Sequence, residues 1–180
     1  MKGGKNKPLL KVGMSRKEVG QMKMGEVLSM KLVQYGTAQP TQIRGCNDSE
    51  IQEMMEAQRV SFLPPIYISF LQWLGKNAGS WRKQVEWSTY TYPDLLNMKV
   101  DSELDVPNDA FVFWTNGVFL SKYFLTSDHN QNPQIYEVSD TFNDRTSYTL
   151  AEDLLYFVKS YEGNEVYSRL LSSVDYGLSN

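Results

Sequence analysis

The sequence predicts a single α+β domain, in which a central, mostly antiparallel sheet is flanked by N-terminal helices and a C-terminal helix. Three observations favour this class. A capped amphipathic helix start lies at Asn47, an Asn116-Gly117 pair typical of hairpins follows a β-rich segment, and a second capped helix start lies at Thr149. With 180 residues, of which 41% are hydrophobic, the chain is long enough to bury one substantial core.

Residues 1–45 are predicted to be a basic N-terminal extension that is flexible or partly helical, followed by the α+β domain over residues 46–180. Apolar residues between Glu18 and Tyr35 allow a helix, although Gly20 and Gly25 each lower its stability by about 1 kcal/mol relative to alanine. The first eleven residues contain two glycines and four lysines, which is typical of a solvated tail.

Two helices are expected between Asn47 and Gly79. The Asn47 side chain can accept a hydrogen bond from the first turn while Glu50 reaches back, so the first helix begins near Asp48. The following Leu-Pro-Pro segment disfavours helical geometry before its first proline and suits the first turn of a second helix, which Gly79 ends. The buried stripe of that second helix is expected to be Ile66, Phe70, Leu71 and Leu74.

Beyond these helices the pattern changes to that of a sheet. Residues 80–92 have no clear periodicity, whereas residues 93–100 are predicted to be helical. Residues 110–114 and 118–125 are expected to form two strands joined by the Asn-Gly pair as a two-residue hairpin turn. After a polar turn, residues 135–138 alternate in the manner of another strand.

The last helical region is predicted to begin at Thr149. Its hydroxyl can cap the first turn, and Glu152, three residues later, completes a capping box. The helix continues through Val158, and Gly163 is expected to break it before a final helix.

Several short segments of the chain follow one another in a characteristic order. They are Leu63-Pro64-Pro65-Ile66-Tyr67-Ile68-Ser69-Phe70-Leu71, Asn77-Ala78-Gly79, Asp109-Ala110-Phe111-Val112-Phe113, Asn116-Gly117-Val118-Phe119, Tyr123-Phe124, Pro133-Gln134-Ile135-Tyr136-Glu137-Val138 and Tyr148-Thr149-Leu150-Ala151-Glu152-Asp153-Leu154-Leu155. This order resembles that of the SUKH superfamily over about residues 47–158. It departs at Thr115-Asn116-Gly117-Val118, where many bacterial members carry His-Gln-Gly-Tyr.

The resemblance implies a function as well as a fold. Bacterial SUKH proteins are typically immunity proteins that bind and neutralise a cognate polymorphic toxin, often a nuclease, and fungal relatives regulate cell-wall assembly. The leading hypothesis is therefore a cytoplasmic immunity protein that acts by direct binding. A second hypothesis is an intracellular regulatory or scaffold protein whose N-terminal extension recruits partners.

Few residues suit catalysis, metal binding or a cofactor. Cys46 is the single cysteine, which excludes an internal disulfide and a thiolate metal cluster, and we expect its thiol to be unreactive. His129 is the single histidine and lies in a polar segment expected to be an exposed loop. Phosphate-binding and dinucleotide-binding glycine motifs do not occur. An enzyme is the third and least favoured class, because it would need a carboxylate site such as Asp101 with Glu103. We therefore predict no catalytic residue, metal or cofactor.

Charge is distributed unevenly along the chain. Residues 1–45 carry nine Lys or Arg against two Glu, a net +7, whereas residues 46–180 carry nine against nineteen, a net −10. An acidic body attracts cationic surfaces, so we expect a protein partner, namely a basic toxin domain. Nucleic-acid binding by the basic segment is disfavoured because it lacks interleaved aromatic residues. No stretch approaches the roughly 20 apolar residues that span a bilayer, and we expect no membrane contact and no secretory signal.

Acidic loops with neighbouring aromatic residues are the predicted partner-binding surface. Core packing suits the two tryptophans equally well, and ordinary solubility is an alternative role for each carboxylate. The sequence leaves the oligomeric state open. The predicted partner-binding residues are Trp81, Glu86, Trp87, Asp94, Asp101, Glu103, Asp105 and Asp128.

Overall fold

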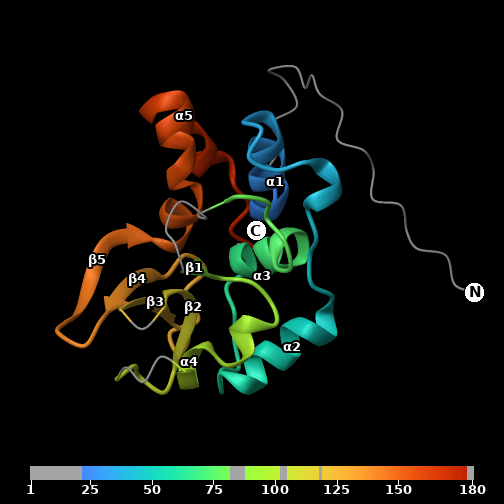
Figure 1. The fold of residues 1–180 in the computed structure, drawn as a ribbon. Coiled ribbons are helices and arrows are strands. Elements are labelled where there is room, and N and C mark those ends of the chain that lie inside the picture. The colour runs from blue at the N-terminus through green and yellow to red at the C-terminus, as the bar shows by residue number, and fades with distance from the viewer. Residues whose placement is uncertain (1–21, 82–87, 102–104, 118, 178–180) are drawn as a thin grey trace, which may run out of the picture.

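The computed structural model describes residues 22–81, 88–101, 105–117 and 119–177. Figure 1 shows a twisted sheet at one side of the molecule with the helices packed above and beside it. The sheet has five strands in the order β1-β2-β3-β4-β5, and every neighbouring pair is antiparallel. The predicted α+β class is confirmed.

Helix α1 spans Met24–Gln34 and packs against α3, which spans Pro65–Leu74. Gly25 makes this close approach possible, because a Cβ atom there would lie 2.2 Å from the carbonyl oxygen of Ser69. The Gly25 amide instead donates a hydrogen bond to Ser69 Oγ at 3.0 Å. The glycine that weakens the helix in isolation therefore brings α1 into the core, where Leu28 is fully buried.

The helix start predicted at Asp48 is confirmed by α2, which spans Asp48–Ala57. Asn47 Oδ1 accepts from the Glu50 amide at 2.9 Å, and Glu50 Oε2 accepts from the Asn47 amide at 2.9 Å. The predicted second helix, α3, ends at Leu74 instead of continuing to Gly79. It ends early because the backbone of Asn77 turns to form a two-way hydrogen-bonded bridge with Arg44.

The principal core lies between α3 and the two central strands, β2 at Ala110–Asn116 and β3 at Leu120–Leu125. Tyr67 of α3 is completely buried, and its ring lies 5.4 Å from Phe111, 6.0 Å from Phe113 and 5.4 Å from Phe124, measured between centroids. The three phenylalanines project from one face of the sheet, so this is the face that the helices cover.

Gln58, at the C-terminal end of α2, completes the edge of the sheet. Strand β1, Ser88–Thr89, pairs with β2 only at Thr115 and Asn116, so Val112 lies beyond the end of β1. The Gln58 amide substitutes for a strand there. Its Oε1 accepts from the Val112 amide at 2.8 Å, and its Nε2 donates to the carbonyl of Val112 at 2.9 Å and to that of Leu95 at 2.9 Å.

The remaining elements agree in part with the sequence predictions. The helix predicted over residues 93–100 is instead a 3-10 turn η2, Asp94–Leu96, and a short helix α4, Met98–Asp101. The β2–β3 hairpin closes at Asn116 and Leu120, so its loop is one residue longer than a two-residue turn. A second 3-10 turn, η1, spans Pro40–Gln42.

Strand β4, Gln134–Val138, confirms the third predicted strand, but β5, Asn143–Thr149, was not predicted. Most residues of β5 are polar and exposed, so it has no apolar alternation to reveal it. Helix α5, Leu150–Ser173, begins with the predicted capping box, and Gly163 leaves helical geometry inside it at φ 80°. Within the described residues, no helix is long and apolar enough to cross a membrane.

Candidate functional site

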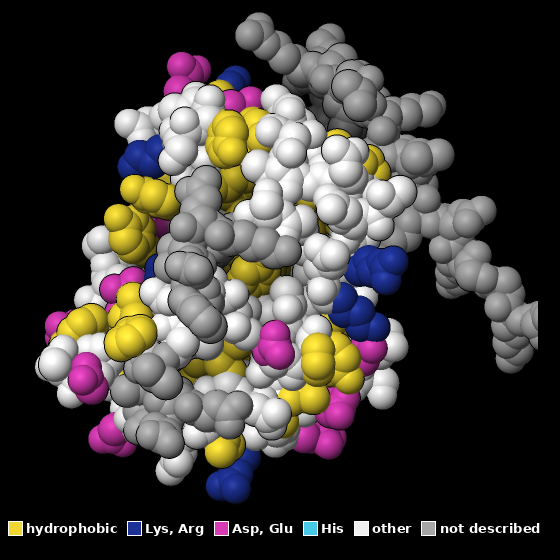
Figure 2. Space-filling view, viewed as in Figure 1, with side chains coloured by type: hydrophobic (Ala, Val, Ile, Leu, Met, Phe, Trp, Pro, Cys, Tyr) yellow, Lys and Arg dark blue, Asp and Glu magenta, His cyan; other side chains and the backbone are white. Residues whose placement is uncertain are grey.

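A cavity of about 550 Å³ opens between α5, the helix-covered face of the sheet and the segments that follow α1 and α3. We refer to it as the aromatic groove. Figure 2 shows hydrophobic side chains exposed on this side of the molecule among carboxylates. The described residues that line it are Leu32, Thr37, Ser80, Trp81, Trp114, Leu120, Lys122, Glu137, Tyr148, Asp153, Tyr156, Phe157, Ser160 and Tyr161.

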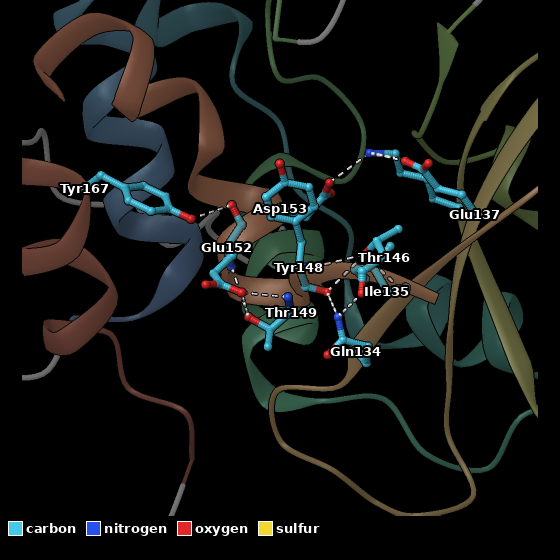
Figure 3. Close-up of polar contacts among 10 residues, drawn as sticks. Gln134, Ile135, Glu137, Thr146, Tyr148, Thr149, Glu152, Asp153 and Tyr167 are labelled. Carbon is cyan, nitrogen blue, oxygen red and sulfur yellow. Dashed lines mark hydrogen bonds and ion pairs between the residues drawn. The ribbon is translucent and has the colours of Figure 1, made fainter. Parts of the chain in front are cut away.

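The wall formed by the sheet carries a cluster of charges. Alternation along β3 places Lys122 on the same face as Phe124, and cross-strand pairing places Glu137 of β4 beside it. The Lys122 Nζ lies 3.3 Å from Glu137 Oε1, 3.0 Å from Asp153 Oδ1 and 5.5 Å from the centroid of the Trp114 ring. Figure 3 shows Asp153 and Glu137 joined by dashed lines to the amine between them.

The start of α5 fixes the position of Asp153. The Thr149 amide donates to Glu152 Oε2 at 2.8 Å, and the Glu152 amide donates to Thr149 Oγ1 at 3.5 Å, as Figure 3 shows. Asp153 follows in the first turn, where the helix dipole favours a carboxylate, and it is 6% exposed. The preceding Tyr148 is held by Gln134, whose Nε2 donates to the Tyr148 carbonyl at 2.6 Å.

Three tyrosines form the outer rim of the groove. Tyr148, Tyr156 and Tyr161 are 39%, 45% and 50% exposed, so a large part of each side chain is accessible to a partner. The Tyr148 and Tyr156 rings meet edge to face with centroids 5.7 Å apart. The Tyr161 ring stacks on Tyr35 at 4.2 Å and 4°. The rim therefore presents rings that are held in place but only half covered.

A polar cluster behind the rim anchors Tyr35. Its hydroxyl donates to Glu162 Oε2 at 2.5 Å, and Lys31 Nζ contacts the same oxygen at 2.5 Å. Burial and the hydrogen bond to Glu162 raise the pKa of Tyr35, so the phenol stays protonated. Burial acts to raise the pKa of Glu162 as well, but the hydrogen bonds from Lys31 and Tyr35 outweigh it and hold that pKa below its usual value. Tyr161 is thus stacked on a ring that cannot easily move.

The predicted partner-binding residues do not meet in one place. Asp94 is exposed on η2, Asp105 is exposed before β2, and Asp128 is exposed in the β3–β4 loop. The segment before β2 contacts that loop, because Thr126 and Ser127 donate hydrogen bonds to Asp109, but no described hydrogen bond or ion pair joins the three predicted carboxylates to one another. Trp81 is 4% exposed and packs between Phe70 and Tyr90, so it forms part of the inner wall of the groove. Glu86, Trp87 and Glu103 lie outside the described residues, and for Asp101 only the backbone, at the end of α4, is described.

Sequence reasoning did not single out the groove residues Lys122, Glu137, Tyr156 and Tyr161. They come from three elements that only the folded sheet brings together. One signal was present in α5, where Tyr156, Phe157, Ser160 and Tyr161 occupy one side of the helix at spacings of one, four and five residues. This stripe lies next to the buried stripe that contains Leu154 and Val158.

Other chemically reactive groups lie apart from the groove. The Cys46 thiol is buried, and burial with the neighbouring Glu50 raises its pKa to about 11, so the thiolate form is disfavoured at neutral pH. His129 is exposed in the β3–β4 loop, and its ring lies 4.8 Å from that of Phe62, measured between centroids, at a tilt of 32°. The described part of the chain contains no group of three or more His, Cys, Asp or Glu residues that could hold a metal ion.

Comparisons of this chain with protein families, curated proteins and solved structures found no match.

Proposed function

We propose that the chain is a non-catalytic protein-binding module that neutralises a cognate polymorphic toxin by direct binding, as an immunity protein of the SUKH type. The observation that carries the proposal is the aromatic groove, with its tyrosine rim and its two carboxylates, on a body whose residues 46–180 have a net charge of −10. The motif order over residues 47–158 supplies independent support.

The rim has the composition of a protein-binding surface. Tyrosine is among the residues that contribute most to interface energy, because it provides a large rigid contact area and a polar hydroxyl. Tyr148 and Tyr161 are already ordered by Tyr156 and Tyr35, so binding costs little side-chain entropy. A partner that covers the rim therefore gains apolar contact at a low ordering cost.

The charge of the body favours a basic partner, and a nuclease is the toxin class that fits best. Enzymes that grip a phosphate backbone present cationic clefts. A net −10 over residues 46–180 accelerates the encounter with such a cleft, and this steering weakens as salt rises. Buried aromatic contacts then set the lifetime of the complex.

The test is co-expression of this chain with the toxin encoded beside its gene. The proposal predicts restored growth and a purified complex whose affinity falls with salt. The double variant Tyr156→Ala with Tyr161→Ala should weaken the complex by about tenfold or more. The control is Phe142→Ala, which removes a ring that is 40% exposed but lies outside the groove lining, and it should leave the affinity unchanged. Absence of both protection and complex would refute the proposal.

The alternative function, an intracellular regulatory or scaffold protein of the cell-wall-assembly type, is favoured by the +7 charge of residues 1–45. The two functions differ in which part of the chain is needed. Because α1 lies in the core, a deletion that tests the basic segment must stop before it, and residues 1–21 are the suitable piece. Loss of function on that deletion supports the regulator, whereas full toxin protection without residues 1–21 supports the immunity protein.

A further inference from the structure

The rings of the groove already have cations placed on their faces. Lys122 Nζ lies 5.5 Å from the centroid of Trp114, and Lys159 Nζ lies 5.7 Å from that of Tyr156. Lys31 Nζ lies 5.6 Å from the centroid of Tyr35, directly behind the rim. The negative faces of electron-rich rings attract such ammonium groups, so these three ring faces are already occupied. Among the described residues no lysine or arginine lies over the rings of Tyr148 and Tyr161, which are therefore the rim rings that still favour positive charge.

The charges in the groove add to this preference. Its described lining contains one ammonium, from Lys122, and two carboxylates, from Glu137 and Asp153. The Glu137 side chain is 31% exposed and its contact with Lys122 is the longer of the two, at 3.3 Å against 3.0 Å. Glu137 is therefore the carboxylate that an incoming cation can reach most easily.

Size and rim geometry limit what the groove can accept. A volume of about 550 Å³ accommodates one or two side chains of a partner and not a folded element. Tyr161 has one ring face against Tyr35 and is still 50% exposed, so a planar group can stack on what remains. A guanidinium meets these requirements better than an ammonium, because it is planar, weakly hydrated and able to pair with a carboxylate through two N–H groups.

We propose that the aromatic groove receives an arginine side chain from a loop of the partner protein. The guanidinium stacks on the exposed face of Tyr161, beside Tyr148 and Tyr156, and its N–H groups donate to Glu137. The proposal rests on the proposed function in one respect only, namely that the protein supplying the arginine is the toxin.

The first experiment uses a small probe and the full chain, so it does not require the toxin. The peptide N-acetyl-Gly-Arg-Gly-amide is titrated into isotope-labelled protein, and binding is followed by NMR. The matched control replaces arginine by citrulline, which has nearly the same shape and no charge. We expect saturable shifts of groove signals with arginine and a Kd about three- to tenfold weaker, or no binding, with citrulline. Equal affinity for the two peptides, or arginine shifts spread outside the groove, would overturn the proposal.

Two variants identify the groove groups, and a third is the control. Tyr161→Ala and Glu137→Gln should each weaken arginine-peptide binding about three- to tenfold. Glu165→Gln removes the same charge from an exposed position of α5 outside the groove lining and should leave binding unchanged. Tyr161 projects at the rim, so its truncation keeps the test informative if Glu137→Gln disturbs the Lys122 cluster. Unchanged binding in Tyr161→Ala would overturn the proposal.

The toxin complex then separates the two proposals. If the toxin binds and protection is full but Tyr161→Ala and Glu137→Gln leave its affinity unchanged, the arginine proposal fails and the proposed function stands. If the arginine peptide binds in the groove and no toxin complex forms, the groove assignment stands and the proposed function fails.

Discussion

Replacing Gln58, the residue that follows α2, by leucine should destabilise the protein strongly, whereas replacing the exposed Gln52 of that helix should not. Gln58 is completely buried and its amide makes three hydrogen bonds, at 2.8, 2.9 and 2.9 Å, to Val112 and Leu95. Each contributes about 1 kcal/mol, and an amide hydrogen left buried without an acceptor costs about 1–3 kcal/mol. The expected loss in the free energy of unfolding is therefore about 4–6 kcal/mol, a large share of the 5–15 kcal/mol typical of a domain.

Urea unfolding followed by tryptophan fluorescence measures this loss as a lower midpoint at an unchanged slope. Gln52→Leu is the matched control, because Gln52 lies on α2 and its side chain, among the described residues, bonds only to the exposed Glu56 side chain, at 3.0 Å. It should change the free energy of unfolding by less than about 0.5 kcal/mol. A loss below about 1 kcal/mol for Gln58→Leu would show that the Val112 edge finds another partner, and the reasoning would be wrong.

Gly25→Ala should lower the free energy of unfolding by about 1–3 kcal/mol although alanine favours a helix more than glycine does, because the added Cβ would lie 2.2 Å from the Ser69 carbonyl oxygen. Thermal or urea unfolding measures this loss, and a stabilised variant would contradict the prediction. Trp114→Phe should cost less than about 1 kcal/mol, since it removes a buried indole N–H for which no described residue is an acceptor; a loss above about 2 kcal/mol would argue against it. Burial opposes ionisation of Glu162, but Lys31 and Tyr35 lower its folded pKa below the unfolded value of about 4.3. Its contribution is therefore complete above that pH and lost as pH falls through the folded pKa, so acid unfolding of Glu162→Gln should show a shallower pH dependence.

The elements that the sequence predicted well are those specified by local interactions. The capping boxes at Asn47 and Thr149 involve residues only three positions apart, and both helices begin where the pattern placed them. The effects of Pro65 and Gly163 are similarly local. Pro65 lies in the first turn of α3, as predicted, and Gly163 leaves helical geometry within α5, as predicted. The predicted end of α3 was wrong because the contact of Asn77 with Arg44, more than thirty residues earlier in the chain, decides where the chain leaves the helix.

The strand β5 and the Gln58 contact show what local patterns omit. A strand that pairs at a polar sheet edge needs hydrogen-bond partners more than apolar alternation, and those partners are known only once β4 is in place. Gln58 appears in the sequence as an ordinary polar residue at a helix end. Its role depends on β1 being too short to reach Val112, a fact of tertiary structure alone.

The sequence did not predict the groove for a related reason. The predicted surface consisted of acidic residues in loops, but Asp94, Asp105 and Asp128, whose side chains the structure describes, lie on three separate segments. The carboxylates that do converge, Glu137 and Asp153, are brought together by Lys122 on a third element. A binding surface of this kind combines one residue from each of several elements. The informative pattern in the sequence is therefore a second aromatic stripe beside the buried stripe of α5, because Tyr156 and Tyr161 widen the apolar side of the helix beyond the face that the core covers and stay half exposed.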